Sequence, residues 1–163
     1  LLPTTVRALA PGGPPARQTP EWRGNGTVMV IDDEAGVRTV TARHLERSGF
    51  EVLTAETGQR GLELLGQHAN VGLVILDLAM PMMSGEECFS RMRAMRPSVP
   101  VIMASGYDEA SVTQRMRGAA ISGFLQKPFK RWELLAVVRR ILGDEVVPAE
   151  TAASRALLSP TDS

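Results

Sequence analysis

Short apolar runs recur along the middle of the chain and alternate with segments of helical periodicity. Each run is bounded by glycine, proline or charged residues and is too short for a buried helix, which is typical of strands in a sheet core. The pattern therefore predicts five strands. The runs are TVMVI (27–31), EVLTA (51–55), GLVILD (72–77), VPVIMAS (99–105) and SGFLQ (122–126).

A helical pattern follows each of these runs. In the first, Val37, Val40 and Leu45 recur at the spacing of one helix face. Ser84 suits the N-cap of the third helix, with acidic residues in the first turn. Apolar strands that alternate with helices predict a doubly wound α/β fold, in which helices cover both faces of a parallel sheet. The expected helices span residues 35–48, 58–68, 84–96, Asp108 or Ser111 to about 118, and 130–142.

The two ends of the chain differ in composition from this middle part. Residues 1–25 contain five prolines and several glycines, a composition typical of a semi-stiff linker that buries no core. Beyond Gly143 large side chains become sparse, so we expect residues 144–163 to form a C-terminal tail. These boundaries leave residues 26–143 as one domain.

Composition and charge exclude several classes of function. Lys+Arg and Asp+Glu both number 18, so the net charge of zero gives no basic field for binding DNA. No apolar stretch reaches the roughly 18 residues that a membrane span needs, so we expect no membrane contact. The single cysteine, Cys88, has no partner for an internal disulfide, which favours a cytoplasmic location.

Polar residues follow four of the five predicted strands. In a parallel α/β sheet the carboxyl ends of the strands meet at one edge, and ligands bind there. We therefore expect these side chains to converge. They are Asp32, Asp33 and Glu34 after the first strand, Asp77 after the third, Ser105 after the fourth and Lys127 after the fifth.

This set of side chains favours phosphoryl transfer. Two carboxylates about 4 Å apart repel each other by roughly 4 kcal/mol at an effective dielectric constant of about 20, so several of them need a cation nearby. Ligands that are all oxygen suit Mg²⁺ or Mn²⁺. With the metal and Lys127 to neutralise the phosphoryl oxygens, Asp77 would attack as the nucleophile.

Four motifs resemble the receiver domain of two-component response regulators in their order and spacing. They are VMVIDDE, VILDLAMPMMSG, VIMASG and FLQKPF. The resemblance covers about residues 26–143. It implies a flavodoxin-like (βα)5 fold with strand order 2-1-3-4-5.

The resemblance also implies a role for each site residue. Asp77 looks like the phosphoacceptor and also like part of the metal site, Asp33 like a direct metal ligand, and Asp32 like an acid that binds the metal through water. The other implied roles are the Ala79 carbonyl as a further metal ligand, Ser105 and Lys127 as phosphoryl-binding groups, Ser105 and Phe124 as the conformational switch, and a cis peptide before Pro128.

The implied partner is a histidine kinase or a histidine phosphotransfer protein, with the chain as an acceptor rather than a turnover enzyme. The opening Leu-Leu-Pro resembles the last strand of a kinase ATP-binding domain, so we expect the C-terminal receiver of a hybrid histidine kinase; a stand-alone regulator is the alternative.

Two further alternatives are disfavoured. A phosphatase of the haloacid dehalogenase type would need an acid where Ala79 stands, and a receiver-like scaffold that takes no phosphate would not need the complete set of site residues. The stimulus, the cognate kinase, the phosphoryl lifetime and the oligomeric state stay open.

Overall fold

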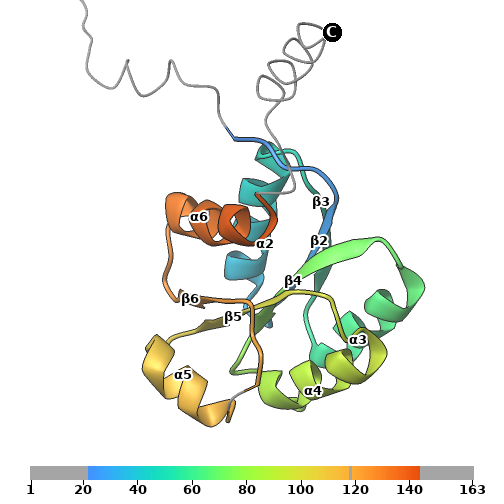
Figure 1. The fold of residues 1–163 in the computed structure, drawn as a ribbon, viewed down its shortest axis with the longest axis vertical. Coiled ribbons are helices and arrows are strands. Elements are labelled where there is room, and N and C mark those ends of the chain that lie inside the picture. The colour runs from blue at the N-terminus through green and yellow to red at the C-terminus, as the bar shows by residue number, and fades with distance from the viewer. Residues whose placement is uncertain (1–21, 118, 144–163) are drawn as a thin grey trace, which may run out of the picture.

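A five-stranded parallel sheet lies between two layers of helices in the computed structural model, which describes residues 22–117 and 119–143 (Figure 1). The strand order is β3-β2-β4-β5-β6, which is the predicted order 2-1-3-4-5 when strands are counted along the chain. The flavodoxin-like fold is therefore confirmed. The strands are β2 (Thr27–Ile31), β3 (Glu51–Ala55), β4 (Val71–Asp77), β5 (Val101–Ser105) and β6 (Gly123–Gln126). The helices are α2 (Ala35–Arg47), α3 (Gly58–Gln67), α4 (Gly85–Met95), α5 (Glu109–Arg115) and α6 (Arg131–Leu142).

The central strands are buried on both faces because each face carries its own core. Successive side chains of a strand point to opposite faces, and β2 shows the result. Met29 and Ile31 pack with the apolar residues of α3, α4 and α5, whereas Val28 and Val30 pack with those of α2 and α6. The continuous apolar runs in the sequence reflect this burial on two sides.

Side-chain caps fix the starts of two helices near the carboxyl edge of the sheet. Ser84 Oγ accepts a hydrogen bond from the N–H of Glu87 (3.1 Å), as expected for the N-cap of α4. Asp108 Oδ1 accepts from the N–H of Ser111 (2.8 Å), so Asp108 is the residue that opens α5. Helix α5 ends at Arg115, earlier than the apolar pattern indicated.

The packed region extends into the segment expected to be linker. The ring of Trp22 lies 5.7 Å from that of Phe50, centroid to centroid, and the Gly24 N–H donates to the Ser48 carbonyl (2.8 Å). A Cβ on Gly24 would lie 2.0 Å from the Phe50 ring, so the contact needs glycine. Residues 22–25 therefore belong to the folded unit, whereas the rest of the expected linker and the expected tail (144–163) lie outside the described residues.

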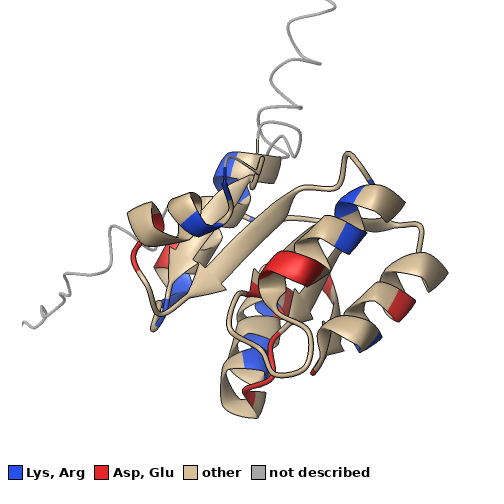
Figure 2. Cartoon of the chain, turned by 90° about the horizontal axis from the view of Figure 1, so that it is seen from below, with Lys and Arg blue, Asp and Glu red and all other residues tan. Residues whose placement is uncertain are grey.

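The charged residues of the described region lie mainly outside the core. In the view of Figure 2, both signs of charge occur on the helices that surround the sheet. Within the described region, no helix combines the length and the apolar character needed to cross a bilayer.

Candidate functional site

Four strands bring polar side chains to the same edge of the sheet, as the sequence predicted. Asp32 follows β2, Asp77 ends β4, Ser105 ends β5, and Lys127 follows β6. The strand register places these residues at similar levels along the strands, since Asp77 pairs with Ala104 on β5, the residue before Ser105. The backbone N–H of Lys127 donates to the Ser105 carbonyl (2.7 Å), which anchors the start of the β6–α6 loop. The peptide bond between Lys127 and Pro128 is cis, as expected.

Three carboxylates form the centre of the site. One oxygen each of Asp32, Asp33 and Asp77 lies within 4.8 Å of the others. Asp32 and Asp77 are buried, and Asp33 is exposed at the rim. Oxygen ligands at this spacing suit a hard divalent cation. The cluster therefore fits a metal of the Mg²⁺ class.

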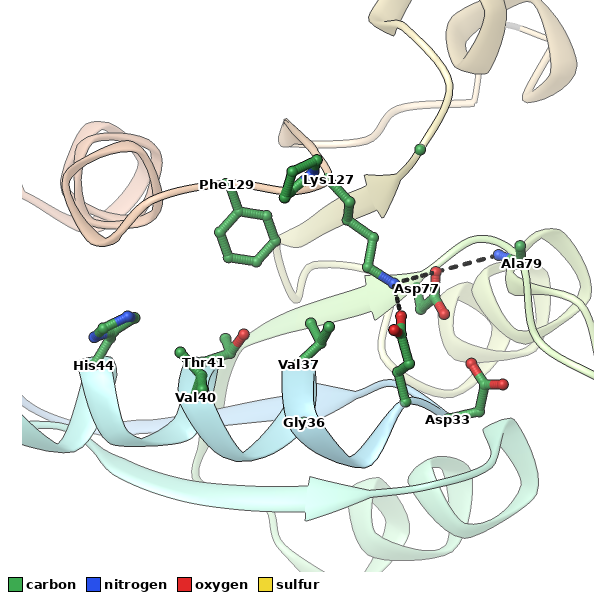
Figure 3. Close-up of a pocket in the computed structure, with 13 residues that line it drawn as sticks. Asp33, Gly36, Val37, Val40, Thr41, His44, Asp77, Ala79, Lys127 and Phe129 are labelled. Atoms are coloured by element: carbon green, nitrogen blue, oxygen red, sulfur yellow. Dashed lines mark hydrogen bonds and ion pairs between the residues drawn. The ribbon is translucent and has the colours of Figure 1, made fainter.

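The ammonium group of Lys127 lies among the acids. Its Nζ is 3.1 Å from Asp32 Oδ2, 3.4 Å from Asp77 Oδ1 and 3.6 Å from Glu34 Oε1. Figure 3 shows the side chain of Lys127 reaching down from the β6–α6 loop towards Asp77 and the start of α2. Lys127 thus supplies one of the cations that the carboxylates need.

Burial and charge together shift the pKa of both partners. Burial is the main cause that raises the pKa of Asp77 to about 7, and the neighbouring Asp32 carboxylate adds to it; Lys127 opposes the shift. Burial alone would lower the pKa of Lys127, but its hydrogen bond to Asp32 and the charge of Asp77 outweigh this and raise it. Asp77 is therefore a carboxyl group whose ionisation depends on the cations beside it.

A tight loop after β4 holds the Asp77 carboxylate. The N–H of Ala79 donates to Asp77 Oδ1 (3.3 Å), and the N–H of Gly85 donates to the Leu78 carbonyl (2.8 Å). A Cβ on Gly85 would lie 2.6 Å from both the Asp77 carbonyl oxygen and Leu78 Cα, so only glycine allows the loop to close this way. Within the loop, Met82 is 96% exposed and adopts a positive φ of 70°. The expected role of the Ala79 carbonyl as a metal ligand stays a prediction.

The two residues expected to act as a switch lie in different surroundings. Ser105 is buried, and its Oγ accepts a hydrogen bond from the N–H of Tyr107 (3.0 Å). Phe124 is half-buried and packs against the core on the side of α3, α4 and α5. Their coupled movement stays a prediction.

A groove of about 890 Å³ runs from Asp77 along α2 to the β6–α6 loop (Figure 3). Val37, Val40 and Thr41 line it from the helix, and Phe129 lines it from the loop. His44 lies at its far end, where burial and then the charge of Arg131 lower its pKa. Part of the apolar stripe of α2 lines the groove rather than the core, and Val40 is 51% exposed. The spacing of that stripe was the signal in the sequence, but it could not distinguish a groove from a core.

Known proteins are similar to this chain in sequence and in fold. Residues 28–139 match the family described as response regulator receiver domain. The chain is 32% identical over 120 residues to the sensor kinase CckA of Brucella abortus, a match that covers 73% of this chain and 13% of that protein. It is 28% identical over 128 residues to the alkaline phosphatase synthesis transcriptional regulatory protein PhoP of Bacillus subtilis, which covers 78% of this chain and 53% of PhoP.

Solved structures are similar to this chain in fold as well. The structure of the chemotaxis protein CheY4 of Vibrio cholerae is similar with a TM-score of 0.67 at 27% identity, over 73% of this chain and 100% of CheY4. CheY4 thus matches the folded unit as a whole, whereas CckA and PhoP are each matched over part of their length.

Proposed function

The chain belongs to the response regulator receiver domain family of two-component systems, and on that premise we propose that Asp77 accepts a phosphoryl group from a phosphohistidine. The observation that carries the proposal is the position of the Asp77 carboxylate, which is buried beside the Asp32 carboxylate and 3.4 Å from the Lys127 ammonium. Such an arrangement holds a nucleophile in place with part of its charge already neutralised.

In this reaction a bond forms between a carboxylate oxygen of Asp77 and phosphorus, while the bond between phosphorus and the donor imidazole nitrogen breaks. The imidazole leaves with the bonding electron pair and stays on the partner. Lys127 offsets the negative charge of the phosphoryl oxygens, and the Ser105 hydroxyl lies at the end of the neighbouring strand, where it would donate to one of them. The Ala79 N–H keeps the carboxylate oriented.

Asp32, Asp33 and Asp77 would hold Mg²⁺ or Mn²⁺ at the same edge. The resemblance implies that Asp33 and the Ala79 carbonyl would be direct ligands and that Asp32 would act through water. When bound, the divalent cation supplies positive charge that offsets both the carboxylates and the incoming phosphoryl group. The spacing of the carboxylate oxygens supports this assignment.

The partner is a histidine kinase or a histidine phosphotransfer protein, and receiver domains as a family interact with such proteins. The groove beside α2 opens next to Asp77 and offers an apolar wall against which this partner would pack. Ser105 and Phe124 would transmit the change in charge at Asp77 to the surface of α5, β6 and α6.

We also propose the kind of protein that contains this receiver. Similarity to part of a sensor kinase supports a hybrid histidine kinase, in which this receiver (residues 26–143 together with the packed residues 22–25) follows a linker. A stand-alone regulator, like the similar CheY4, remains the alternative.

Chemical phosphorylation tests the assignment directly. We expect acetyl phosphate or phosphoramidate with Mg²⁺ to add one phosphoryl group to the chain, as measured by intact mass, and we expect Asp77→Asn to abolish the addition. Asp108→Asn is the matched control, because asparagine caps a helix as well as aspartate does and Asp108 lies outside the carboxylate cluster. Labelling of Asp77→Asn at the wild-type level would disprove the assignment, and a wild-type chain that is never labelled would favour a scaffold that takes no phosphate.

A further inference from the structure

Lys127 and a divalent cation would both bind the same carboxylates. Asp32 and Asp77 both contact the Lys127 ammonium, and both belong to the cluster that fits a metal. Both oxygens of Asp32 are already engaged, since Oδ1 accepts from the Glu34 N–H (2.8 Å) and Oδ2 faces Lys127 (3.1 Å). A metal that takes up these acids therefore has to share them with Lys127.

Glu34 is the third acid that Lys127 contacts, and its surroundings differ from those of the other two. Its side chain is 68% exposed, against 5% for Asp32 and 4% for Asp77. Glu34 occupies the N-cap position of α2, yet its side chain makes no capping hydrogen bond and extends instead to within 3.6 Å of Lys127 Nζ. The nearby Arg38 does not occupy this carboxylate, because its Nη1 donates to the Asp32 carbonyl (2.7 Å). Glu34 thus offers Lys127 a partner at the mouth of the site, outside the carboxylate cluster.

We propose that Glu34 is a positioning residue for Lys127: it holds the ammonium towards the mouth of the site and thereby frees Asp32 and Asp77 to take up the divalent cation. Without Glu34 the ammonium keeps, among the described residues, only the two buried carboxylates as ion-pair partners and competes with the metal for them. This inference rests on the proposed function of the site and adds a residue to which the sequence assigned no role.

A simpler explanation is that Glu34 only adds negative charge near the metal. The two explanations differ for Glu34→Asp, which keeps the charge but shortens the side chain by one methylene. Aspartate at an N-cap also accepts hydrogen bonds from the first turn of its own helix, which directs it away from Lys127. If only charge matters, Glu34→Asp behaves like the wild type; if Glu34 positions Lys127, it behaves like Glu34→Gln. Because aspartate is a good N-cap, the variant is expected to fold.

The chain offers a clean reporter, since Lys127 and Lys130 are its only lysines. Lysine labelled with ¹³C and ¹⁵N gives two side-chain signals, with exposed Lys130 as the internal reference. Calorimetry with MgCl2 alone gives the metal affinity. Glu46→Gln is the control, because Glu46 carries the same charge at the far end of the same helix and is exposed.

We expect both Glu34→Gln and Glu34→Asp to weaken Mg²⁺ binding by about 3- to 10-fold, somewhat less than the roughly 10- to 100-fold effect of residues that orient metal ligands directly. The Lys127 signal should shift in both variants before any metal is added, while Glu46→Gln leaves affinity and signal unchanged. A wild-type affinity in Glu34→Asp, or an unmoved Lys127 signal in either variant, would overturn the proposal. Neither measurement involves a phosphoryl donor, so its failure would leave the assignment of Asp77 untouched.

Discussion

Lys127 Nζ lies 3.4 Å from Asp77 Oδ1, although strand β5 separates the strands that carry the two residues. The contact is possible because all strands of the sheet are parallel, so the residues that end β4 and follow β6 reach the same edge. Lysine has the length to cross the intervening strand, and its ammonium then meets both Asp77 and Asp32. This relationship between the two side chains determines what each variant of the site should do.

Lys127→Ala should lose most of the phosphorylation response. The variant removes the ammonium that offsets the charge of the phosphoryl oxygens, so we expect labelling by acetyl phosphate to slow by at least roughly tenfold. Intact-mass time courses give the rate. Lys130→Ala is the matched control, because Lys130 is exposed and makes none of the described ion pairs of the site. Equal rates in the two variants would make Lys127 dispensable for the reaction.

Asp33→Asn should weaken Mg²⁺ binding more than Asp32→Asn does. Asp33 is exposed at the rim, whereas Asp32 is engaged with Lys127 and with the Glu34 N–H. The resemblance makes Asp33 a direct ligand of the metal, whereas Asp32 would bind it through water, so loss of Asp33 should cost more affinity. Calorimetry should show at least about a tenfold weakening for Asp33→Asn. If the two variants lose affinity equally, the ranking of the two acids is wrong.

Asp77 should destabilise the metal-free fold at high pH. The pKa of this carboxyl group is about 7 in the folded chain and 3.8 ordinarily, so between these values the folded state binds more protons than the unfolded state. The free energy of unfolding therefore falls as the pH rises through that window. At pH 8 we expect Asp77→Asn to be more stable than the wild type by on the order of 2–4 kcal/mol, with little difference at pH 4.

Urea unfolding in the presence of a chelator measures both variants at the two pH values. Asp108→Asn serves again as the control, because Asp108 is fully exposed and its pKa is lowered rather than raised. A stability gain in Asp77→Asn that is the same at pH 4 and pH 8 would contradict the raised pKa as its cause.

Gly85→Ala should destabilise the chain and disturb the site together. The new Cβ would press on the Asp77 carbonyl and on Leu78, both of which are backbone and lead directly to the phosphoacceptor. Overpacking of this kind costs roughly 1–3 kcal/mol. Gly36→Ala provides the contrast, because a Cβ there meets nothing within 4 Å and helix propensity should stabilise the chain by up to about 1 kcal/mol. Thermal unfolding of the two variants should therefore shift in opposite directions.

The sequence predicted the strands, their parallel arrangement and the residues at their carboxyl ends. Apolar runs indicated the central strands because burial on two faces leaves few polar positions inside them, and the residues at the strand ends followed from the parallel arrangement. The sequence alone therefore predicted that Asp77, Ser105 and Lys127 lie close together. The short helix α5 was predicted less well, because its few buried residues give a weak periodic signal.

Features that depend on side-chain direction could not be predicted in this way. Val40 has the spacing of a core residue, but its neighbours on the β6–α6 loop leave a groove beside it. In the sequence, Glu34 is simply a third acidic residue after β2. Only its contact with Lys127 in the structure distinguishes it from a solvated charge. Nothing in the local sequence indicates that Met82 adopts a positive φ, because glycine is the residue that favours this conformation.

The contact between Trp22 and Phe50 attaches the start of the folded chain to the amino edge of the sheet, opposite Asp77. A phosphoryl donor joined through residues 1–21 would therefore be attached near the amino ends of the strands, whereas Asp77 lies at their carboxyl ends. The donor would have to span the length of the strands, about 17 Å. If a linker of 21 residues behaved as a random coil, its root-mean-square reach would be roughly 25 Å, and a linker shorter by about ten residues would reach only about 18 Å. Because Trp22 anchors the chain there, the length of the segment before it would determine how often a tethered donor meets Asp77.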